Sequence, residues 1–388
     1  MVEPQKQTLK TGTGKQPPAV LVLGAYGLAG EAITKGLIQF TDARIMVAGR
    51  NSEKLQQLVN TVGSARITSR LFDVFNQPAL KKACDETDLV INAIGPVSIS
   101  GLEIARAVSD SGTPLIDLAV EQIHYQRLQQ IEPSVKNHHT IIIPAAGLAP
   151  GFATLLMKHA IEKLSEIETM EMFYVQGRIP DPDSGLGSIM GAVLDPLFGS
   201  MTYRKNRYVE EKFGENIREE KMPEPFGLTK MLGISTIDTL LLPPVLGCAN
   251  FQTYFAVGVE PPPGLDLIIR TLKPHKYPLS FWMISKFAKY TMRQSYRKAL
   301  KEGKTTGGYI KVRATNSGQC WEAIASYHDG GTATAYLPVI LTKKILSGKI
   351  QKKGIVPVTD IIDLTRMQHE LDAMNCAIPV QENIVPIE

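Results

Sequence analysis

The feature that most constrains this chain is an apolar strand that runs directly into a glycine-rich turn and a helix. Residues 19–31 read AVLVLGAYGLAGE, with Gly24, Gly27 and Gly30 three residues apart, and a helical pattern follows over residues 28–39. The first backbone N–H groups of such a helix have no partner within it, and together with the helix dipole they favour a phosphate anion. Glycine keeps Cβ atoms from standing between these donors and the ligand. The stretch therefore predicts a diphosphate-binding corner whose contacts are Gly24, Tyr26, Gly27, Leu28 and Ala29.

The spacing is G-x-x-G-x-x-G, with Ala25 where dinucleotide-binding sequences usually carry a glycine. A glycine-rich turn kept only for packing is the alternative. The strand before the turn and the helix behind it favour dinucleotide binding, because both are needed to aim the N–H groups at a ligand.

The end of the second predicted strand, residues 44–49, indicates which dinucleotide is bound. Proteins that bind NAD usually carry Asp or Glu there for the ribose 2′-hydroxyl, whereas this chain has Arg50, Asn51 and Ser52. A guanidinium pairs with phosphate oxygens, so Arg50 and Asn51 are expected to bind a 2′-phosphate, which favours NADP(H) over NAD(H). The alternative is that Arg50 is a solvated charge and that Ser52 caps a helix over residues 53–61.

Strands and helical patterns alternate up to about residue 150, which predicts an α/β fold with a Rossmann-type, doubly wound parallel sheet. Ligands of such sheets lie at the carboxyl ends of the strands. We therefore expect Asp73 on the adenine side of the cofactor, and Ala93, Ile94, Gly95 and Pro96 beneath the ribose and nicotinamide. Ordinary turn chemistry is the alternative for both. After the first strand, strands are predicted at residues 44–49, 67–72, 89–93, 114–116 and 140–143, with a helix at residues 102–109 among the patterns between them.

The composition fits a two-domain enzyme. The chain has 388 residues, of which 44% are hydrophobic, and a formal net charge of only +4. No block of Lys and Arg reaches the length typical of nucleic-acid binding, which argues against that role. Its four cysteines, which form no C-x-x-C pair, indicate reduced thiols in a cytoplasmic protein and no zinc site; they are Cys84, Cys248, Cys320 and Cys376.

Three segments bear on targeting and membranes. Residues 1–18 are polar and are expected to form a loose tail rather than a signal peptide. Two long uncharged stretches follow, at residues 140–157 and 239–259. Prolines and glycines divide the first into strand, turn and helix, and the second suits buried sheet better than a lipid-facing helix.

Several motifs resemble the saccharopine dehydrogenase-like family, also called saccharopine reductase-like. They are GAYGLAG at residues 24–30, DLVINAIGPVS at 88–98, GTPLIDLAVE at 112–121 and AGLAPG at 146–151, with a further match at residues 330–357. The resemblance implies a dinucleotide-binding domain at residues 19–150 and an inserted α+β domain for substrate binding and dimerisation at residues 151–331. It also implies a segment at residues 332–388 that returns to the first domain.

The resemblance further implies an NAD(P)-dependent oxidoreductase that acts on carbon–nitrogen bonds through an imine, with an amino acid or keto acid as substrate. Some relatives reduce unsaturated, lipid-like substrates, and a non-catalytic NADP(H) sensor or scaffold is an alternative of another class. Fold alone does not decide between these functions.

Site residues beyond the cofactor corner follow from this chemistry. A charged imine needs a nearby carboxylate or an acid, and Asp117 and Glu121 after the fifth strand suit that need, although both could instead order their loop. The candidates for holding a substrate carboxylate are Ser98, Arg178 and Ser188. No H-E-x-x-H or G-x-S-x-G motif occurs, so no metal is expected.

Residues 280–301 form a basic segment with aromatic residues, SFWMISKFAKYTMRQSYRKALK. Our first interpretation is a helix that packs between domains or in a homodimer, with a solvated rim. The alternative is a peripheral contact with an anionic membrane.

Overall fold

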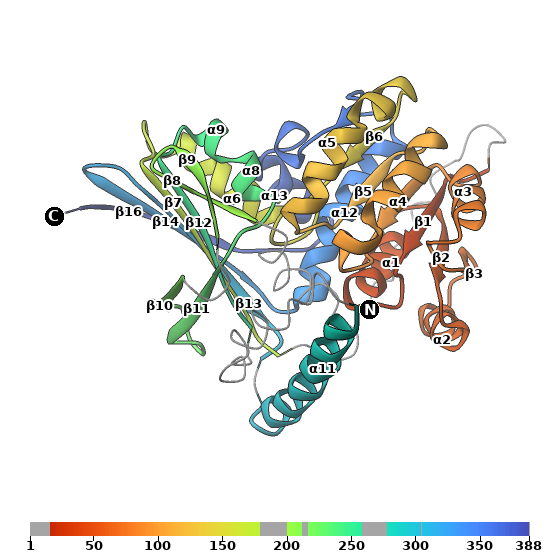
Figure 1. Ribbon diagram of the computed structural model, residues 1–388, viewed down its shortest axis with the longest axis horizontal. Coiled ribbons are helices and arrows are strands. Elements are labelled where there is room, and N and C mark those ends of the chain that lie inside the picture. The colour runs from red at the N-terminus through yellow and green to blue at the C-terminus, as the bar shows by residue number, and fades with distance from the viewer. Residues whose placement is uncertain (1–15, 179–199, 212–215, 258–277, 304, 388) are drawn as a thin grey trace, which may run out of the picture.

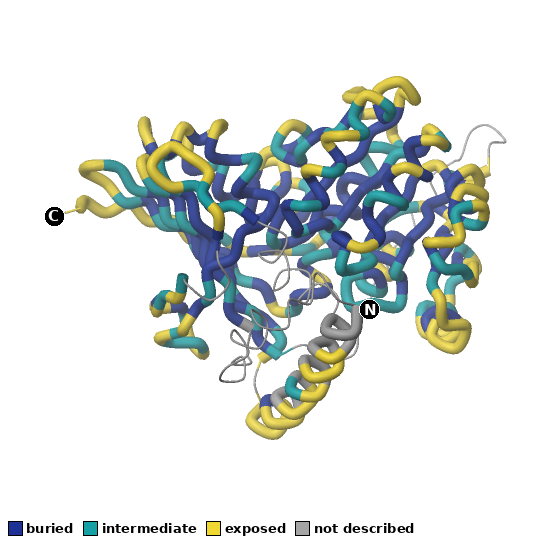
Figure 2. Tube along the Cα trace, viewed as in Figure 1, coloured by how far each residue is buried: buried dark blue, intermediate teal, exposed yellow. Residues whose placement is uncertain are grey.

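The computed structural model of the chain describes residues 16–178, 200–211, 216–257, 278–303 and 305–387. These residues form two sheets that lie side by side, with the helix α12 between them (Figure 1). Buried positions are concentrated inside each half and along the junction between them (Figure 2). Ser188 lies outside the described residues.

The first domain is built on a parallel sheet whose strand order is β15-β6-β5-β4-β1-β2-β3. Every neighbouring pair in it is parallel, as the sequence predicts. Its central strands are runs of Val, Ile and Leu because both of their faces are covered by helices. The strands are β1 Ala19–Leu23, β2 Arg44–Gly49, β3 Ile67–Leu71, β4 Leu89–Asn92, β5 Leu115–Asp117, β6 Ile141–Ile143 and β15 Gly354–Ile355. The helices between them are α1 Leu28–Phe40, α2 Ser52–Val62, α3 Gln77–Asp85, α4 Val97–Asp110 and α5 Gln122–Asn137.

The observed bounds differ from the prediction at informative places. Asp117 is the last residue of β5 rather than the residue after it. Helix α2 begins at Ser52 and is capped by Asn51, whose Oδ1 accepts a hydrogen bond from the Lys54 N–H at 2.9 Å. The helix predicted at residues 102–109 is the last part of a longer helix, α4, which begins directly after the loop that follows β4.

The second domain is a mixed sheet with the strand order β10-β11-β12-β7-β13-β14-β16, and β8 and β9 branch from β12. Helix α6 packs on one face of it, where Met172, Val312 and the fully buried Trp321 join one core with the first domain. The strands are β7 Thr169–Gln176, β8 Met201–Arg204, β9 Arg207–Glu210, β10 Ile217–Lys221, β11 Leu228–Ile234, β12 Asn250–Val257, β13 Gly308–Thr315, β14 Gln319–Tyr327 and β16 Val380–Pro386. The helices are α6 Phe152–His159, η1 Ala160–Glu162, α8 Asp238–Leu241, α9 Pro243–Leu246 and α11 Pro278–Lys301.

The C-terminal segment is shared between the two sheets. Helix α12 Gly330–Leu346 packs along α1, and β15 extends the parallel sheet beside β6. After η3 Val358–Asp360 and α13 Leu364–Ala373, strand β16 pairs with β14 in the second sheet. Residues 332–388 thus contact both domains: α12 and β15 lie against the first, and β16 belongs to the second sheet.

The stretch at residues 239–259 is not continuous sheet. It begins within α8 and α9, where Pro243 and Pro244 occupy the first turn of a short helix, and only then enters β12. Proline suits a first helical turn because its missing N–H would have no partner there. Within the described residues, no helix has both the length and the apolar character that crossing a membrane requires.

The two domains meet at the loop after β5. The Ile237 N–H donates to the Val120 carbonyl at 3.0 Å. The Gln122 side chain, at the start of α5, donates to the Met201 carbonyl at 2.7 Å and to the Thr236 carbonyl at 3.0 Å, and it accepts from the Met201 N–H at 2.7 Å. These contacts fix the second domain against the carboxyl edge of the parallel sheet.

A buried acid lies at this junction. The Asp238 carboxyl has no exposed surface, and its Oδ1 accepts from the Thr154 hydroxyl at 2.7 Å, which in turn accepts from the Gly151 N–H at 2.8 Å. Among the described residues, Asp238 Oδ2 has no hydrogen-bond partner. Burial raises the pKa of Asp238 from 3.8 to about 7.

This shift predicts that ionisation of Asp238 destabilises the fold. The stabilising neutral form is fully present below the unfolded-state pKa of 3.8, and its contribution is lost as the pH rises through about 7. We expect Asp238→Asn to gain up to about 4 kcal/mol of unfolding free energy relative to wild type between pH 4 and pH 8. Urea denaturation across this range measures it, with the exposed Asp360→Asn as the matched control. A pH dependence that is the same in wild type and Asp238→Asn would refute the assignment.

Candidate functional site

Two glycines at the corner between β1 and α1 leave no room for a side chain. Gly24 has a φ of +73°, and a Cβ there would lie 2.9 Å from the Ala93 carbonyl oxygen. A Cβ on Gly30 would lie 2.2 Å from the Gly24 carbonyl oxygen. Since both obstacles are backbone atoms, they cannot move as the end of a side chain can. The glycine spacing is thus explained by the tight turn and by the close packing of α1 on that turn.

The N-terminus of α1 is open to a ligand. Gly27 is the N-cap residue and provides no side-chain hydrogen bond to the helix. The Gly27 N–H donates to the Gly24 carbonyl at 3.0 Å, which closes the turn, and Gly27, Leu28 and Ala29 are half-buried. The first amides of the helix have no intrahelical acceptors. Because Gly24 and Gly27 have no Cβ, space for a ligand is left beside these amides. This corner fits a diphosphate group.

Tyr26 links the corner to the end of β2. Its hydroxyl accepts a hydrogen bond from the Arg50 N–H at 3.2 Å. Its ring lies against Gly49, where an added Cβ would be 2.3 Å from Tyr26 Cε1, and the Lys54 ammonium stands 5.9 Å from the ring centroid. The Arg50 backbone and the Lys54 ammonium therefore both contact the tyrosine at the strand end where the cofactor's ribose is expected.

The polar residues after β2 and β3 make different interactions. Arg50 Nη1 lies 3.6 Å from Asp73 Oδ2, and the two side chains are 74% and 42% exposed. An ion pair this exposed contributes little, so the guanidinium can exchange the carboxylate for a phosphate. Asn51 and Asp73 both make local hydrogen bonds instead: Asn51 caps α2, and Asp73 Oδ1 accepts from the Phe75 N–H at 3.0 Å. The expected contact of the Asn51 side chain with the cofactor thus competes with its role as helix cap.

A buried network braces the loop at residues 93–97. Asp117 Oδ2 lies 2.7 Å from His124 Nε2, and Asp117 Oδ1 accepts from the Asn92 amide at 3.1 Å. Asn92 Oδ1 in turn accepts from the Ile94 N–H at 3.1 Å. Asp117, His124 and Asn92 are completely buried. The network therefore runs from α5 through the end of β5 to the loop that leaves β4.

Glu121 holds the other end of the same loop. Its Oε1 accepts from the Val97 N–H at 2.9 Å and its Oε2 from the Val120 N–H at 3.1 Å. Burial raises the pKa of the Glu121 carboxyl, although hydrogen bonds from the backbone of Glu121, Val120 and Ser98 oppose the shift. The Arg127 guanidinium donates to the Ser98 carbonyl at 2.6 Å, so the side chains of Glu121 and Arg127 together fix the start of α4.

Comparison with known proteins fits this geometry. Residues 20–143 match the family model described as "Saccharopine dehydrogenase NADP binding domain". These residues form a saccharopine dehydrogenase-type NADP-binding domain. For this domain, the match confirms the predicted saccharopine dehydrogenase-like type and the predicted NADP(H) cofactor.

Known proteins are similar in sequence to the saccharopine dehydrogenase-type domain, and a solved structure is similar in fold. A "Lipid droplet localized protein" of Caenorhabditis elegans is 24% identical over 138 residues, which cover 33% of this chain and 32% of that protein. A mouse "Saccharopine dehydrogenase-like oxidoreductase" is 27% identical over 124 residues, covering 28% and 29%. The matched stretch thus spans about a third of these relatives. The apo saccharopine dehydrogenase (L-Glu forming) of Saccharomyces cerevisiae is 14% identical with a TM-score of 0.63, covering 95% of this chain and 100% of that chain. This likeness extends the shared fold to both domains.

The predicted catalytic and substrate-binding residues do not all lie in one place. Asp117 and Glu121 lie within the saccharopine dehydrogenase-type domain beside the loop at residues 93–97, but their carboxylates face protein groups. Ser98 is buried in the first turn of α4. Arg178 follows β7 in the second domain, where its N–H donates to the Thr305 carbonyl at 2.9 Å.

Asn92 and His124 are site residues that the sequence reasoning missed. His124 pairs with a carboxylate seven residues earlier in the chain, a contact that a search for metal-binding motifs does not reveal. Gly101 is a sequence sign of this buried histidine, because a Cβ at residue 101 would lie 2.4 Å from His124 Cε1. Among the described residues, no group of three or more His, Cys, Asp or Glu side chains could hold a metal ion.

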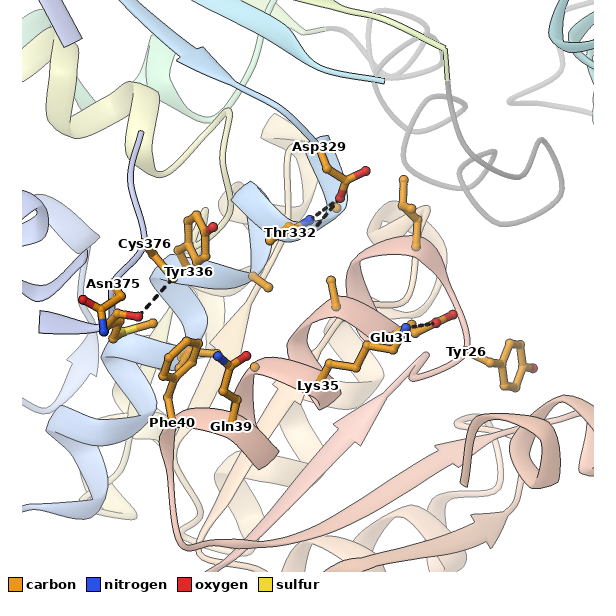
Figure 3. A pocket seen from close by; sticks show the side chains of 17 residues that line it. Tyr26, Glu31, Lys35, Gln39, Phe40, Asp329, Thr332, Tyr336, Asn375 and Cys376 are labelled. Carbon is orange, nitrogen blue, oxygen red and sulfur yellow. Dashed lines mark hydrogen bonds and ion pairs between the residues drawn. The ribbon is translucent and has the colours of Figure 1, made fainter. Parts of the chain in front are cut away.

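A groove of about 820 Å³ runs along the outside of α1 and α12. Figure 3 shows Tyr26 at one end and Asn375 and Cys376 at the other, with Lys35 and Thr332 on its walls. The groove shares Tyr26 and Leu28 with the saccharopine dehydrogenase-type cofactor corner, but its lining does not include Gly24 or the loop at residues 93–97. It is therefore a crevice between α1 and α12 that is separate from that loop.

Proposed function

We propose that this chain is an NADP(H)-dependent oxidoreductase that acts on a carbon–nitrogen bond of an amino acid, or of the imine formed from a keto acid and an amine. The observation that carries the proposal is the braced loop at residues 93–97 beside an open diphosphate corner. Both lie at the carboxyl edge of the parallel sheet, where the second domain docks. The likeness of both domains to the yeast saccharopine dehydrogenase fold supports the choice of bond.

Each part of the cofactor has residues to hold it. The diphosphate would lie against the N-terminus of α1, and the 2′-phosphate beside Arg50 and Lys54. The ribose and nicotinamide would lie over Ala93, Ile94, Gly95 and Pro96. When bound, NADPH supplies a hydride to the carbon of the C=N bond, whose nitrogen gains a proton to give the amine.

Asp117 and Glu121 act in this proposal as positioning residues. Both carboxylates are buried, and their oxygens accept hydrogen bonds from the loop or from residues attached to it. A loop fixed at both ends keeps the nicotinamide and the imine carbon in one geometry, which is most of what hydride transfer asks of the protein. Ser98, Arg178 and Ser188 stay our predicted contacts for the substrate carboxylate.

A substrate screen tests the proposed reaction. NADPH oxidation is followed by its absorbance with pairs of amines and 2-oxo acids, and in a second arm with α,β-unsaturated acyl thioesters. We expect turnover only in the first arm. Turnover confined to the second arm would overturn the carbon–nitrogen assignment in favour of a lipid-like substrate. Tight NADPH binding without turnover in either arm would overturn the enzymatic role in favour of a sensor.

Arg50→Asp is expected to reverse the cofactor preference. Loss of the guanidinium and the added negative charge should raise the Kd for NADPH about 100-fold, while the Kd for NADH changes less than about threefold. Isothermal titration with both nucleotides measures the two effects. Arg70→Asp is the matched control, since Arg70 is an exposed arginine of the neighbouring strand that pairs with Glu86 at 3.0 Å. Equal losses for NADPH and NADH would show that Arg50 does not contact the 2′-phosphate.

A further inference from the structure

Helix α11 carries an unbalanced charge. Its sequence from Pro278 to Lys301 contains no Asp or Glu, and its basic residues are Lys286, Lys289, Arg293, Arg297, Lys298 and Lys301. The helix extends away from both sheets at the edge of the molecule (Figure 1). Exposed positions follow it along much of its length (Figure 2). It is therefore a cationic helix, in which Lys298 pairs at 3.9 Å with Glu302, the residue directly after its end.

Large apolar side chains lie on one face of this helix. Met283, Phe287 and Tyr290 are spaced four and three residues apart, which places them on the same side, and they are 49%, 41% and 62% exposed. Single exposed hydrophobic residues are common on proteins, but three neighbours on one helix face indicate a surface that a partner covers.

The helical period continues this face into basic residues. Arg297 and Lys301 fall seven and eleven residues after Tyr290, and Arg297, Lys298 and Lys301 are exposed. Lys286 lies beside the apolar residues at the other end and is exposed as well. One face thus presents apolar anchors in its first half and cations along its whole length.

The charges decide between two partners for this face. A second copy of α11 would place cations against cations, whether it packed parallel or antiparallel, because the six basic residues far outnumber Glu302, the acid directly after the helix. A surface of anionic lipid headgroups offers phosphates to the cations and an apolar layer to the anchors.

We propose that α11 docks the protein on an anionic lipid surface. Met283, Phe287 and Tyr290 reach the boundary between headgroups and acyl chains, and Arg297, Lys298 and Lys301 pair with lipid phosphates. The helix lies in the plane of the surface, since its six cations are incompatible with a span. This docking is independent of the proposed reaction.

Vesicle flotation of the full chain tests the proposal. We expect binding to vesicles of phosphatidylcholine with 30% phosphatidylserine, at least about tenfold more than to phosphatidylcholine alone, and loss of that binding at high salt. The double variants Phe287→Ser/Tyr290→Ser and Arg297→Glu/Lys298→Glu should each lower the partition coefficient about tenfold or more. The control Lys352→Glu/Lys353→Glu, on the surface loop after α12, should stay within about twofold of wild type.

Two measurements separate docking from other effects. NADPH affinity and melting temperature should be unchanged in all these variants, so that a loss of vesicle binding is not a loss of fold. No binding to anionic vesicles, or binding that the α11 variants leave unchanged, would overturn the proposal. So would light scattering that shows a dimer which the Phe287→Ser/Tyr290→Ser variant converts to a monomer, because the face would then be a subunit interface.

Discussion

Gly30→Ala is expected to abolish measurable NADPH binding, with a Kd at least about 100-fold above that of wild type. The new Cβ would lie 2.2 Å from the Gly24 carbonyl oxygen and 2.8 Å from the Ala25 Cα, so α1 and the turn must separate. That separation moves the first amides of α1 away from the diphosphate. It should also cost about 1–3 kcal/mol of unfolding free energy, as overpacking does. Isothermal titration and thermal unfolding measure the two effects.

Ala29→Asp keeps this prediction testable if Gly30→Ala fails to fold. A carboxylate in the first turn of α1 interacts favourably with the helix dipole, so the fold should keep its melting temperature, but the charge repels a diphosphate. We expect at least a tenfold loss of NADPH affinity, with the neutral Ala29→Asn close to wild type. Gly318→Ala is the glycine control, because no atom lies within 4 Å of its added Cβ. Unchanged affinity in both Gly30→Ala and Ala29→Asp would place the diphosphate elsewhere.

Asp117→Ala is expected to cost about 3–5 kcal/mol of unfolding free energy. It leaves His124 Nε2 and the Asn92 amide without their buried acceptor, and it releases the loop that Asn92 holds through the Ile94 N–H. NADPH affinity should fall about tenfold as the loop loses its fixed geometry. Urea denaturation and isothermal titration with NADPH check the two quantities.

The conservative variant distinguishes positioning from chemistry. In Asp117→Asn, the new carbonyl can accept from Asn92, and the new amide can donate to His124 Nε2 if the imidazole carries its proton on Nδ1. Stability and NADPH affinity should then stay within about 1.5 kcal/mol of wild type. A stable Asp117→Asn protein that binds NADPH normally but has lost turnover at least 100-fold would contradict the positioning role and favour a direct role of the carboxylate.

The first domain could be predicted from the sequence because its signals are local. Strands buried on both faces are continuous apolar runs, and the glycine spacing indicates where the backbone of α1 packs closely on the turn after β1. The boundaries were less certain: Asn51 rather than Ser52 caps α2, a choice that one hydrogen bond to the Lys54 N–H decides. Strand β16 was missed because most of its residues are exposed, and it is a strand only through its pairing with β14.

The contacts of the predicted site residues could not be derived from the sequence. Asp117 and Glu121 were selected because they follow a strand end, and they do lie beside the loop at residues 93–97. Their burial depends on α4 and α5 packing together, which no local pattern encodes. The pairing of Gln122 with Met201, 79 residues away, is likewise a tertiary contact that periodicity does not reveal.

The central claim is that the corner between β1 and α1 holds the diphosphate of NADP(H), with Arg50 and Lys54 beside the 2′-phosphate. Isothermal titration of the purified chain with NADPH and with NADH tests it most directly. We predict saturable binding of one NADPH per chain, at least about tenfold tighter than NADH, which corresponds to about 1.4 kcal/mol. Absence of saturable heat with both nucleotides, or tighter binding of NADH, would contradict it.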